Sequence, residues 1–114
     1  MLRLSNLDPA ALRDLTLYDQ LYAFTPTPVV ALNRAVALAE VHGPAAGLAA
    51  VDDLRSSGLD SYYLFYASRA DLLRRLGRTT EAAAAYATAR ALTANPVEQA
   101  FLDTQRAGIR TGKV

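Results

Sequence analysis

Five polar side chains have the types and spacing to form a binding surface: Asn33, Arg34, Arg69, Asp71 and Arg74. An asparagine amide donates and accepts hydrogen bonds at once, so Asn33 could hold the backbone of an extended peptide. Arginine guanidinium groups pair with carboxylates in a fixed fork geometry. We therefore take these five residues as a candidate partner-binding groove.

Arg34 and Arg69 also have a structural interpretation. Each follows a polar residue, and each occupies the same position in an internal repeat described below. In such a repeat they could bond carbonyl groups or acids of a neighbouring helix, and Asp19 and Asp53 are the candidate acids. The sequence leaves both roles open.

The other arginines form a cluster, because Arg69, Arg74, Arg75 and Arg78 fall within ten residues. One interpretation is that they complement the carbonyl end of a helix that stops at Gly77. The alternative is a basic edge that meets an acidic partner.

Residues suited to catalysis are scarce. The absence of cysteine excludes disulfides, thiolate metal sites and a cysteine nucleophile. His42 is the single histidine, which disfavours a multi-histidine metal site and a catalytic triad. The six glycines are scattered singly, so no glycine-rich phosphate loop is present. We expect no enzymatic activity, no metal site and no cofactor.

Charge and hydropathy narrow the class of partner. Twelve Lys and Arg face eleven Asp and Glu, and this net charge of +1 disfavours direct nucleic-acid binding by this domain. No apolar run is long enough to span a bilayer. The N-terminal residues 1–8 do not resemble a signal peptide, because polar residues interrupt the apolar stretch. We expect a cytoplasmic protein.

The elements that position these residues are predicted to be helices. Hydrophobic residues make up 52% of the 114 residues, and apolar side chains recur at helical spacing. Val97, Phe101 and Ile109 are the expected core of the last helix, Glu98 is placed for a capping box, and residues 108–112 are expected to fray. Expected helix starts are Asp8-Pro9, Thr27-Pro28, Pro44, Asp60 or Ser61, Thr79 or Thr80, and Asn95-Pro96, and expected stops are Gly43, Ser57-Gly58 and Gly77.

The chain matches itself at an offset of 35 residues, which places Arg34 on Arg69 and Ala35 on Ala70. This period is typical of helix-pair solenoids. We predict an all-α fold of about six antiparallel helices, arranged as a right-handed tetratricopeptide-like solenoid in a single domain over residues 1–114. A generic antiparallel helical bundle is the alternative. The expected parts are a partial repeat 8–27, a repeat 28–60, a repeat 61–95 and a terminal helix 96–109.

The second repeat resembles the tetratricopeptide motif, whereas the first repeat is degenerate. Large aromatic or aliphatic residues, small residues and a turn glycine fall at the positions that the motif requires. These residues are Tyr66, Ala70, Leu73, Gly77, Ala82, Tyr86 and Ala89.

Longer strings resemble one particular family. Residues 17–44 (LYDQL…TPTPVVALNRAVALAEVHGP), 62–77 and 92–96 (LTANP) are similar to the C-terminal extension of bacterial extracytoplasmic-function (ECF) RNA polymerase sigma factors. The resemblance covers residues 9–106 and implies a tetratricopeptide-like module that regulates transcription initiation through protein contacts. The implied partners are the sigma-factor DNA-binding domains or the RNA polymerase core. No part of this sequence resembles the promoter-binding domains themselves.

Two other functions remain open from the sequence. Tyr62, Tyr63 and Tyr66 could surround a small-molecule pocket, because tyrosine combines an apolar ring with a hydroxyl group. The chain could also be a stand-alone tetratricopeptide-like adaptor. An uncapped end of a helical repeat could also form a homodimer.

Overall fold

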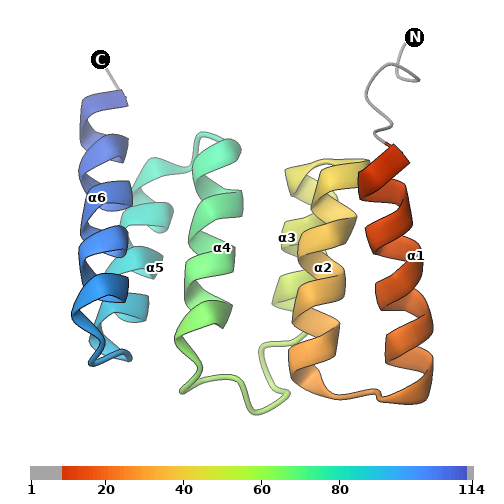
Figure 1. The fold of residues 1–114 in the computed structure, drawn as a ribbon. Helices are drawn as coiled ribbons and strands as arrows, with labels where there is room; N and C mark the ends of the chain where they lie inside the picture. Colours follow the sequence, from red (N-terminus) through yellow and green to blue (C-terminus); the bar gives the residue numbers. More distant parts are fainter. Residues whose placement is uncertain (1–8, 113–114) are drawn as a thin grey trace, which may run out of the picture. The chain divides into compact units, whose positions relative to one another are not determined.

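The computed structural model describes the backbone of residues 9–112 and the side chains of residues 9–109. The described residues form helices and no strand, which confirms the all-α prediction. The helices are α1 (Pro9–Phe24), α2 (Pro28–His42), α3 (Pro44–Asp52), α4 (Tyr63–Arg75), α5 (Thr79–Ala91) and α6 (Pro96–Gly112) (Figure 1). None of them has the length and apolarity needed to cross a membrane.

The chain divides into two compact units after Gly58. The first unit contains α1, α2 and α3, and the second contains α4, α5 and α6. This division lies close to the predicted boundary between repeats at residues 60 and 61.

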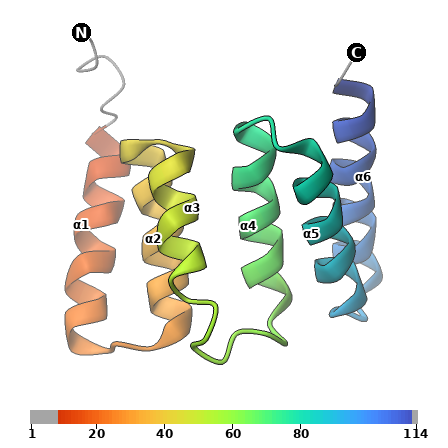
Figure 2. The same cartoon turned by 180° about the vertical axis from the view of Figure 1, so that it is seen from behind.

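In the first unit, α2 packs against α1 on one side and α3 on the other (Figures 1 and 2). The core between α2 and α3 is built from small residues and a few larger ones. A Cβ atom added to Gly47 would lie 3.1 Å from the Cα of Ala39 and 3.2 Å from the carbonyl oxygen of Ala35. The close crossing of α2 and α3 therefore requires glycine at position 47. α1 contributes no fully buried residue.

In the second unit, α5 packs between α4 and α6. Phe65 and Leu73 of α4 are buried, as is Leu102 of α6. The expectation that Val97 and Phe101 belong to the core is wrong, because 77% and 58% of these residues are exposed. The helix instead turns Leu102 and Ile109 inward. The expected contribution of Ile109 is confirmed.

Several predicted helix ends are confirmed. The Thr27 hydroxyl accepts a hydrogen bond from the Val30 amide at 3.2 Å, as expected of an N-cap followed by proline. Gly43 closes α2 with a φ of 98°, a value that favours glycine. The Asn95 side chain accepts bonds from the amides of Val97 and Glu98, at 2.8 and 3.3 Å.

Other predicted ends are wrong. α3 ends at Asp52 instead of continuing to Ser57, because the chain tightens into turns with i to i+3 hydrogen bonds such as Leu54 N to Val51 O at 2.9 Å. α4 begins after Tyr62 and has no side-chain cap, so neither Asp60 nor Ser61 caps it.

The end of the chain also differs from expectation. The Glu98 carboxylate accepts a bond from the Thr93 hydroxyl at 2.5 Å, and the Asn95 amide donates to the same Thr93 oxygen at 3.2 Å. Glu98 therefore does not complete a capping box. α6 continues as a helix through Gly112, where fraying was expected. At the start of the chain, the expected cap at Asp8 lies outside the described residues.

The helices repeat with the period at which the sequence matches itself. α2 and α4 begin at Pro28 and Tyr63, and α3 and α5 begin at Pro44 and Thr79, so both pairs are 35 residues apart. Small residues are buried at equivalent positions of the two hairpins, with Ala35 and Ala70 exposed by 1% and 0% respectively.

Candidate partner-binding surface

The five predicted groove residues lie on two helices. Asn33 and Arg34 belong to α2 in the first unit, and Arg69, Asp71 and Arg74 belong to α4 in the second. The five residues are therefore divided between the two units.

α2 presents a stripe of exposed residues, which we call the α2 stripe: Val29, Asn33, Val36 and Glu40. Their spacing of four, three and four residues places them on one face of the helix. Val29 and Val36 are 41% and 36% exposed, so an apolar side chain lies one turn away from Asn33 on either side. Among the described residues, the Asn33 side chain has no hydrogen-bonding partner. Its donor and acceptor groups are available to a ligand.

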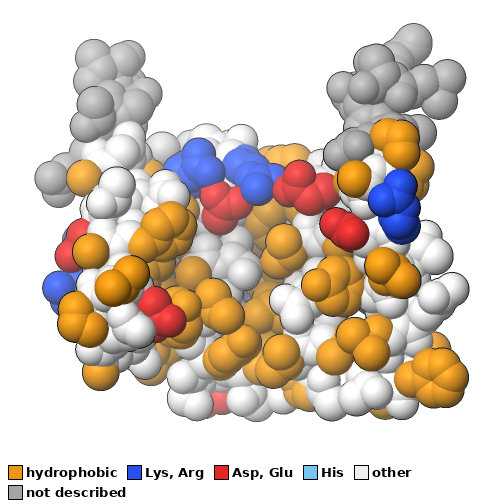
Figure 3. All heavy atoms as spheres, viewed as in Figure 1, with side chains coloured by type: hydrophobic (Ala, Val, Ile, Leu, Met, Phe, Trp, Pro, Cys, Tyr) orange, Lys and Arg blue, Asp and Glu red, His pale blue; other side chains and the backbone are white. Residues whose placement is uncertain are grey.

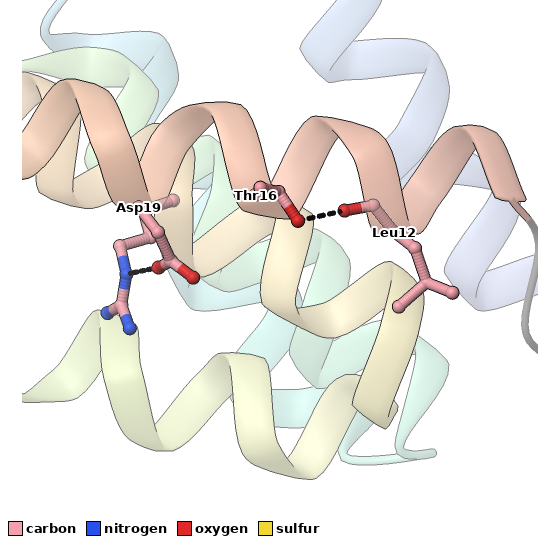
Figure 4. A network of polar contacts seen from close by, with 4 residues as sticks. Leu12, Thr16 and Asp19 are labelled. Carbon is pink, nitrogen blue, oxygen red and sulfur yellow. Dashed lines mark hydrogen bonds and ion pairs between the residues drawn. The ribbon is translucent and has the colours of Figure 1, made fainter.

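Arg34 belongs to the packing of α1 on α2. Its Nε donates to the Oδ1 of Asp19, which is one of the two acids expected for it (Figure 4). The two side chains are 41% and 49% exposed, so we expect the pair to contribute at most about 1 kcal/mol to stability. On the same face of α1, the Thr16 hydroxyl donates to the Leu12 carbonyl at 2.9 Å. This ion pair gives Arg34 a structural role within the first unit, whereas the side chain of Asn33 is available to a ligand.

α4 presents an equivalent stripe, the α4 stripe: Leu64, Ser68, Asp71 and Arg75. Each member follows its counterpart in the α2 stripe by 35 residues. The apolar position at the start is kept, since Leu64 is 39% exposed. The later positions differ in chemistry, because Val36 is replaced by Asp71 and Glu40 by Arg75. The two faces therefore match in geometry but not in charge.

Asp71 holds two arginines at the end of α4. Its Oδ1 lies 2.5 Å from the Nη2 of Arg74, and its Oδ2 lies 2.9 Å from the Nη2 of Arg75. Arg78 binds both carboxylate oxygens of Glu81 at 2.8 Å, and this interaction lowers the pKa of Glu81. Figure 3 shows basic and acidic side chains gathered near the C-terminal end of α4. These arginines pair with acids of their own turns.

Arg74 has a further partner that sequence reasoning missed. Its guanidinium donates a hydrogen bond to the hydroxyl of Tyr86, a residue of α5 that is 2% exposed. The hydrogen bonds to Asp71 and Tyr86 raise the pKa of Arg74, and burial raises the pKa of Tyr86. Arg74 therefore satisfies a buried hydroxyl, which is a structural role. This hydrogen bond depends on the register between α4 and α5, so only the structure shows it.

Titration of Tyr86 should make stability depend on pH in alkaline solution. Because the pKa of Tyr86 is raised above its ordinary value of 10.0, its contribution to stability is complete below pH 10 and is lost as pH rises through the raised pKa. We expect the free energy of unfolding in urea to fall as pH rises above about 10. The fall should be smaller in Tyr86→Phe, whereas Tyr22→Phe, which changes a 38% exposed residue, should keep the wild-type profile. Equal profiles for all three proteins would contradict this prediction.

Two of the three tyrosines proposed for a small-molecule pocket have their hydroxyl groups engaged. Tyr66 donates to the carbonyl of Asp60 at 3.2 Å, and its ring meets Phe65 edge to face at 5.1 Å. Burial raises the pKa of Tyr63, and its hydrogen bond to Glu98 raises it further. These contacts hold the start of α4 against its neighbours.

Side chains that could ligate a metal ion do not gather in the part of the chain that the structure describes. No group of three His, Asp or Glu side chains there could hold a metal ion. His42 is exposed in the last turn of α2.

Comparison with known proteins adds one relative. An uncharacterized protein of Rhizobium meliloti (strain 1021) is 43% identical over 89 residues, which are 78% of this chain and 21% of that protein. The chain thus spans about a fifth of the length of the curated relative that it matches. No protein-family model matches the sequence, and no solved structure matches it significantly.

Proposed function

We propose that this chain is a non-catalytic protein-interaction module that regulates an ECF-type RNA polymerase sigma factor. The observation that carries the proposal is the α2 stripe, in which the unpartnered amide of Asn33 lies between two exposed valines. An amide that donates and accepts can bond the backbone of an extended segment, and the valines can contact its side chains. The amide and the two valines together suit recognition of an extended protein segment.

The tetratricopeptide-like arrangement is part of this proposal. It is supported by the common 35-residue offset of the helix starts and by the buried small residues at equivalent positions, including Gly47 and Ala82. A generic bundle of amphipathic helices has no reason to keep one period in both its helix starts and its closest crossings. The expected right-handed solenoid follows from this assignment.

The module is proposed to act within a longer protein. The extent of the Rhizobium relative supports this, since the matched region is 21% of that protein. The proposed partners are the sigma-factor DNA-binding domains or the RNA polymerase core, in the cytoplasm, with no direct contact of this module to nucleic acid or membrane. The stand-alone adaptor and the homodimer are the competing arrangements.

Capture of purified sigma DNA-binding domains or core polymerase by the immobilised chain tests the proposal. We expect Asn33→Ala to weaken capture about five-fold, the value of one hydrogen bond near 1 kcal/mol. Gln20→Ala, which removes another exposed amide on α1, is the matched control and should capture normally. Arg34→Ala is tested separately, because it also breaks the pair with Asp19.

The outcomes separate the two parts of the proposal. Unchanged capture by Asn33→Ala would remove the α2 stripe from the binding surface. Failure of the wild-type chain to capture either partner would overturn the regulatory function itself.

A further inference from the structure

α1 is the counterpart of α5 in both sequence and packing. Residues 18–28 (YDQLYAFTPTP) match residues 86–96 (YATARALTANP) at an offset of 68 residues, with a tyrosine, an alanine, a threonine and a proline in common. Each of the two helices packs against the helix that follows it, α1 on α2 and α5 on α6. These following helices begin at the proline of the match, Pro28 and Pro96.

α1 differs from α5 in what covers its other side. α5 also packs against α4, whereas no described helix of the first unit occupies that place beside α1 (Figure 2). Ala85 and Ala89 of α5 are buried. The residues at the same positions of α1, Leu17 and Leu21, are 55% and 44% exposed. Because α2 packs on α1 as α6 packs on α5, the exposed leucines mark the face of α1 that lacks a counterpart of α4.

Asp14 is the third member of this surface, which we call the α1 face: Asp14, Leu17 and Leu21. Asp14 takes the position that Gly47 and Ala82 have in the later repeats. Gly47 lies at the close crossing of α2 and α3, against Ala35. A helix on the α1 face would therefore pass closest at Asp14, which is exposed and forms no ion pair with another described residue. Covering this carboxylate is favourable only if the incoming helix supplies a Lys or Arg.

A second copy of this chain does not suit the α1 face. α6 is the last described helix, so it is the helix that would pair with α1 if copies stacked end to end. Its residue at the position of Ala35 and Ala70 is Asp103. Stacking would bring Asp103 and Asp14 together at the close crossing, where two like charges repel. The charge of the α1 face therefore favours a different partner, with a basic residue at this point.

We propose that the α1 face binds an amphipathic helix of a partner protein, which takes the place that α4 has on α5. A Lys or Arg of the partner helix pairs with Asp14, and its apolar side chains cover Leu17 and Leu21, one and two turns further along α1. Leucines stand here where α5 has alanines, so the partner helix presents smaller apolar residues than α4 does. This site is separate from the α2 stripe and does not depend on a role in transcription.

Selection from a display library of helical peptides on the immobilised chain tests the proposal. Each peptide has the sequence of residues 61–78, with random residues at the four positions that are buried in α4: Phe65, Ala70, Leu72 and Leu73. We expect enrichment of Lys or Arg at position 70, which lies opposite Asp14 when the peptide packs on α1 as α4 packs on α5.

Variants of the α1 face measure its contribution to binding. The best enriched peptide should bind about five-fold more weakly to Asp14→Asn and about ten-fold more weakly to Leu21→Gln. Asp53→Asn and Val97→Gln are the matched controls, because they change an exposed acid and an exposed apolar residue elsewhere. Both controls should bind the peptide normally.

An exchange of charges separates binding from folding. Asp14→Lys should lose the enriched peptide and should bind the same peptide with Glu at position 70. Far-ultraviolet circular dichroism verifies that each variant is folded.

The remaining outcomes would overturn the proposal. They are a lack of enriched peptides, enrichment without a basic residue at position 70, and equal binding by wild type, Asp14→Asn and Leu21→Gln. A dimer in light scattering that Leu21→Gln dissociates would assign the α1 face to a second copy instead. Capture through the α2 stripe is measured separately, so the proposed function can stand or fail independently of these results.

Discussion

Phe65→Ala is expected to lower the free energy of unfolding by about 3–5 kcal/mol, the usual cost of removing a buried phenylalanine ring. Phe65 is 2% exposed and is among the largest fully buried side chains described. Its removal leaves a cavity in the core of the second unit and deletes the edge-to-face contact with Tyr66. Urea unfolding followed by far-ultraviolet circular dichroism measures the loss.

The chain contains a matched control for this variant. Phe24→Ala removes the same side chain where it is 89% exposed, at the end of α1, so its effect should stay within about 0.5 kcal/mol. Similar losses for the two variants would mean that the burial of Phe65 is not what the structure describes.

Gly47→Ala has the second-largest expected effect, a loss of about 2 kcal/mol. The added methyl group would press against Ala39, including its backbone, where α3 crosses α2. Alanine is ordinarily the better helix former by about 1 kcal/mol, so a destabilisation would show that the steric cost exceeds the gain in propensity. Urea unfolding and the thermal midpoint measure the change.

Two further variants isolate the steric cause. Gly108→Ala, in α6, adds a methyl group that meets no atom within 4 Å, and it should stabilise the protein by about 0.5–1 kcal/mol. Adding Ala39→Gly to Gly47→Ala removes the methyl group that the new side chain meets, so the double variant should recover part of the loss. No recovery would place the cost of Gly47→Ala elsewhere.

The positions of most helices could be predicted because their ends carry strong local signals. Proline is tolerated in the first turn of a helix and Thr27 and Asn95 satisfy free amides there, so α2 and α6 begin where the sequence indicates. The end of α3 has no such signal, because the choice between α-helical and tighter turns after Asp52 depends on packing within the first unit.

The buried face of α6 could not be predicted from hydrophobicity. Phe101 and Leu102 are neighbours, and a helix turns about 100° between them, so the contact with α5 buries one and exposes the other. By size and hydrophobicity, Phe101 would be expected in the core. The packing of α6 on α5 instead buries Leu102.

The contacts of the candidate surface were predictable only where they are local. Arg74 and Arg75 follow Asp71 by three and four residues, so one helical turn brings them together. Asp19 could be named for Arg34 because two successive helices pack side by side. The bond from Arg74 to Tyr86 depends on the register between α4 and α5, which no spacing rule supplies.

α1 has no fully buried residue, and this determines which helix opens first. Local opening costs little where few apolar side chains are buried, so α1 can detach from α2 well before either core melts. The Asp19–Arg34 bond breaks in the same event. Detachment of the whole of α1 is therefore the event that frees the charge of Arg34. Any factor that favours this detachment also exposes the face of α2 that α1 covers.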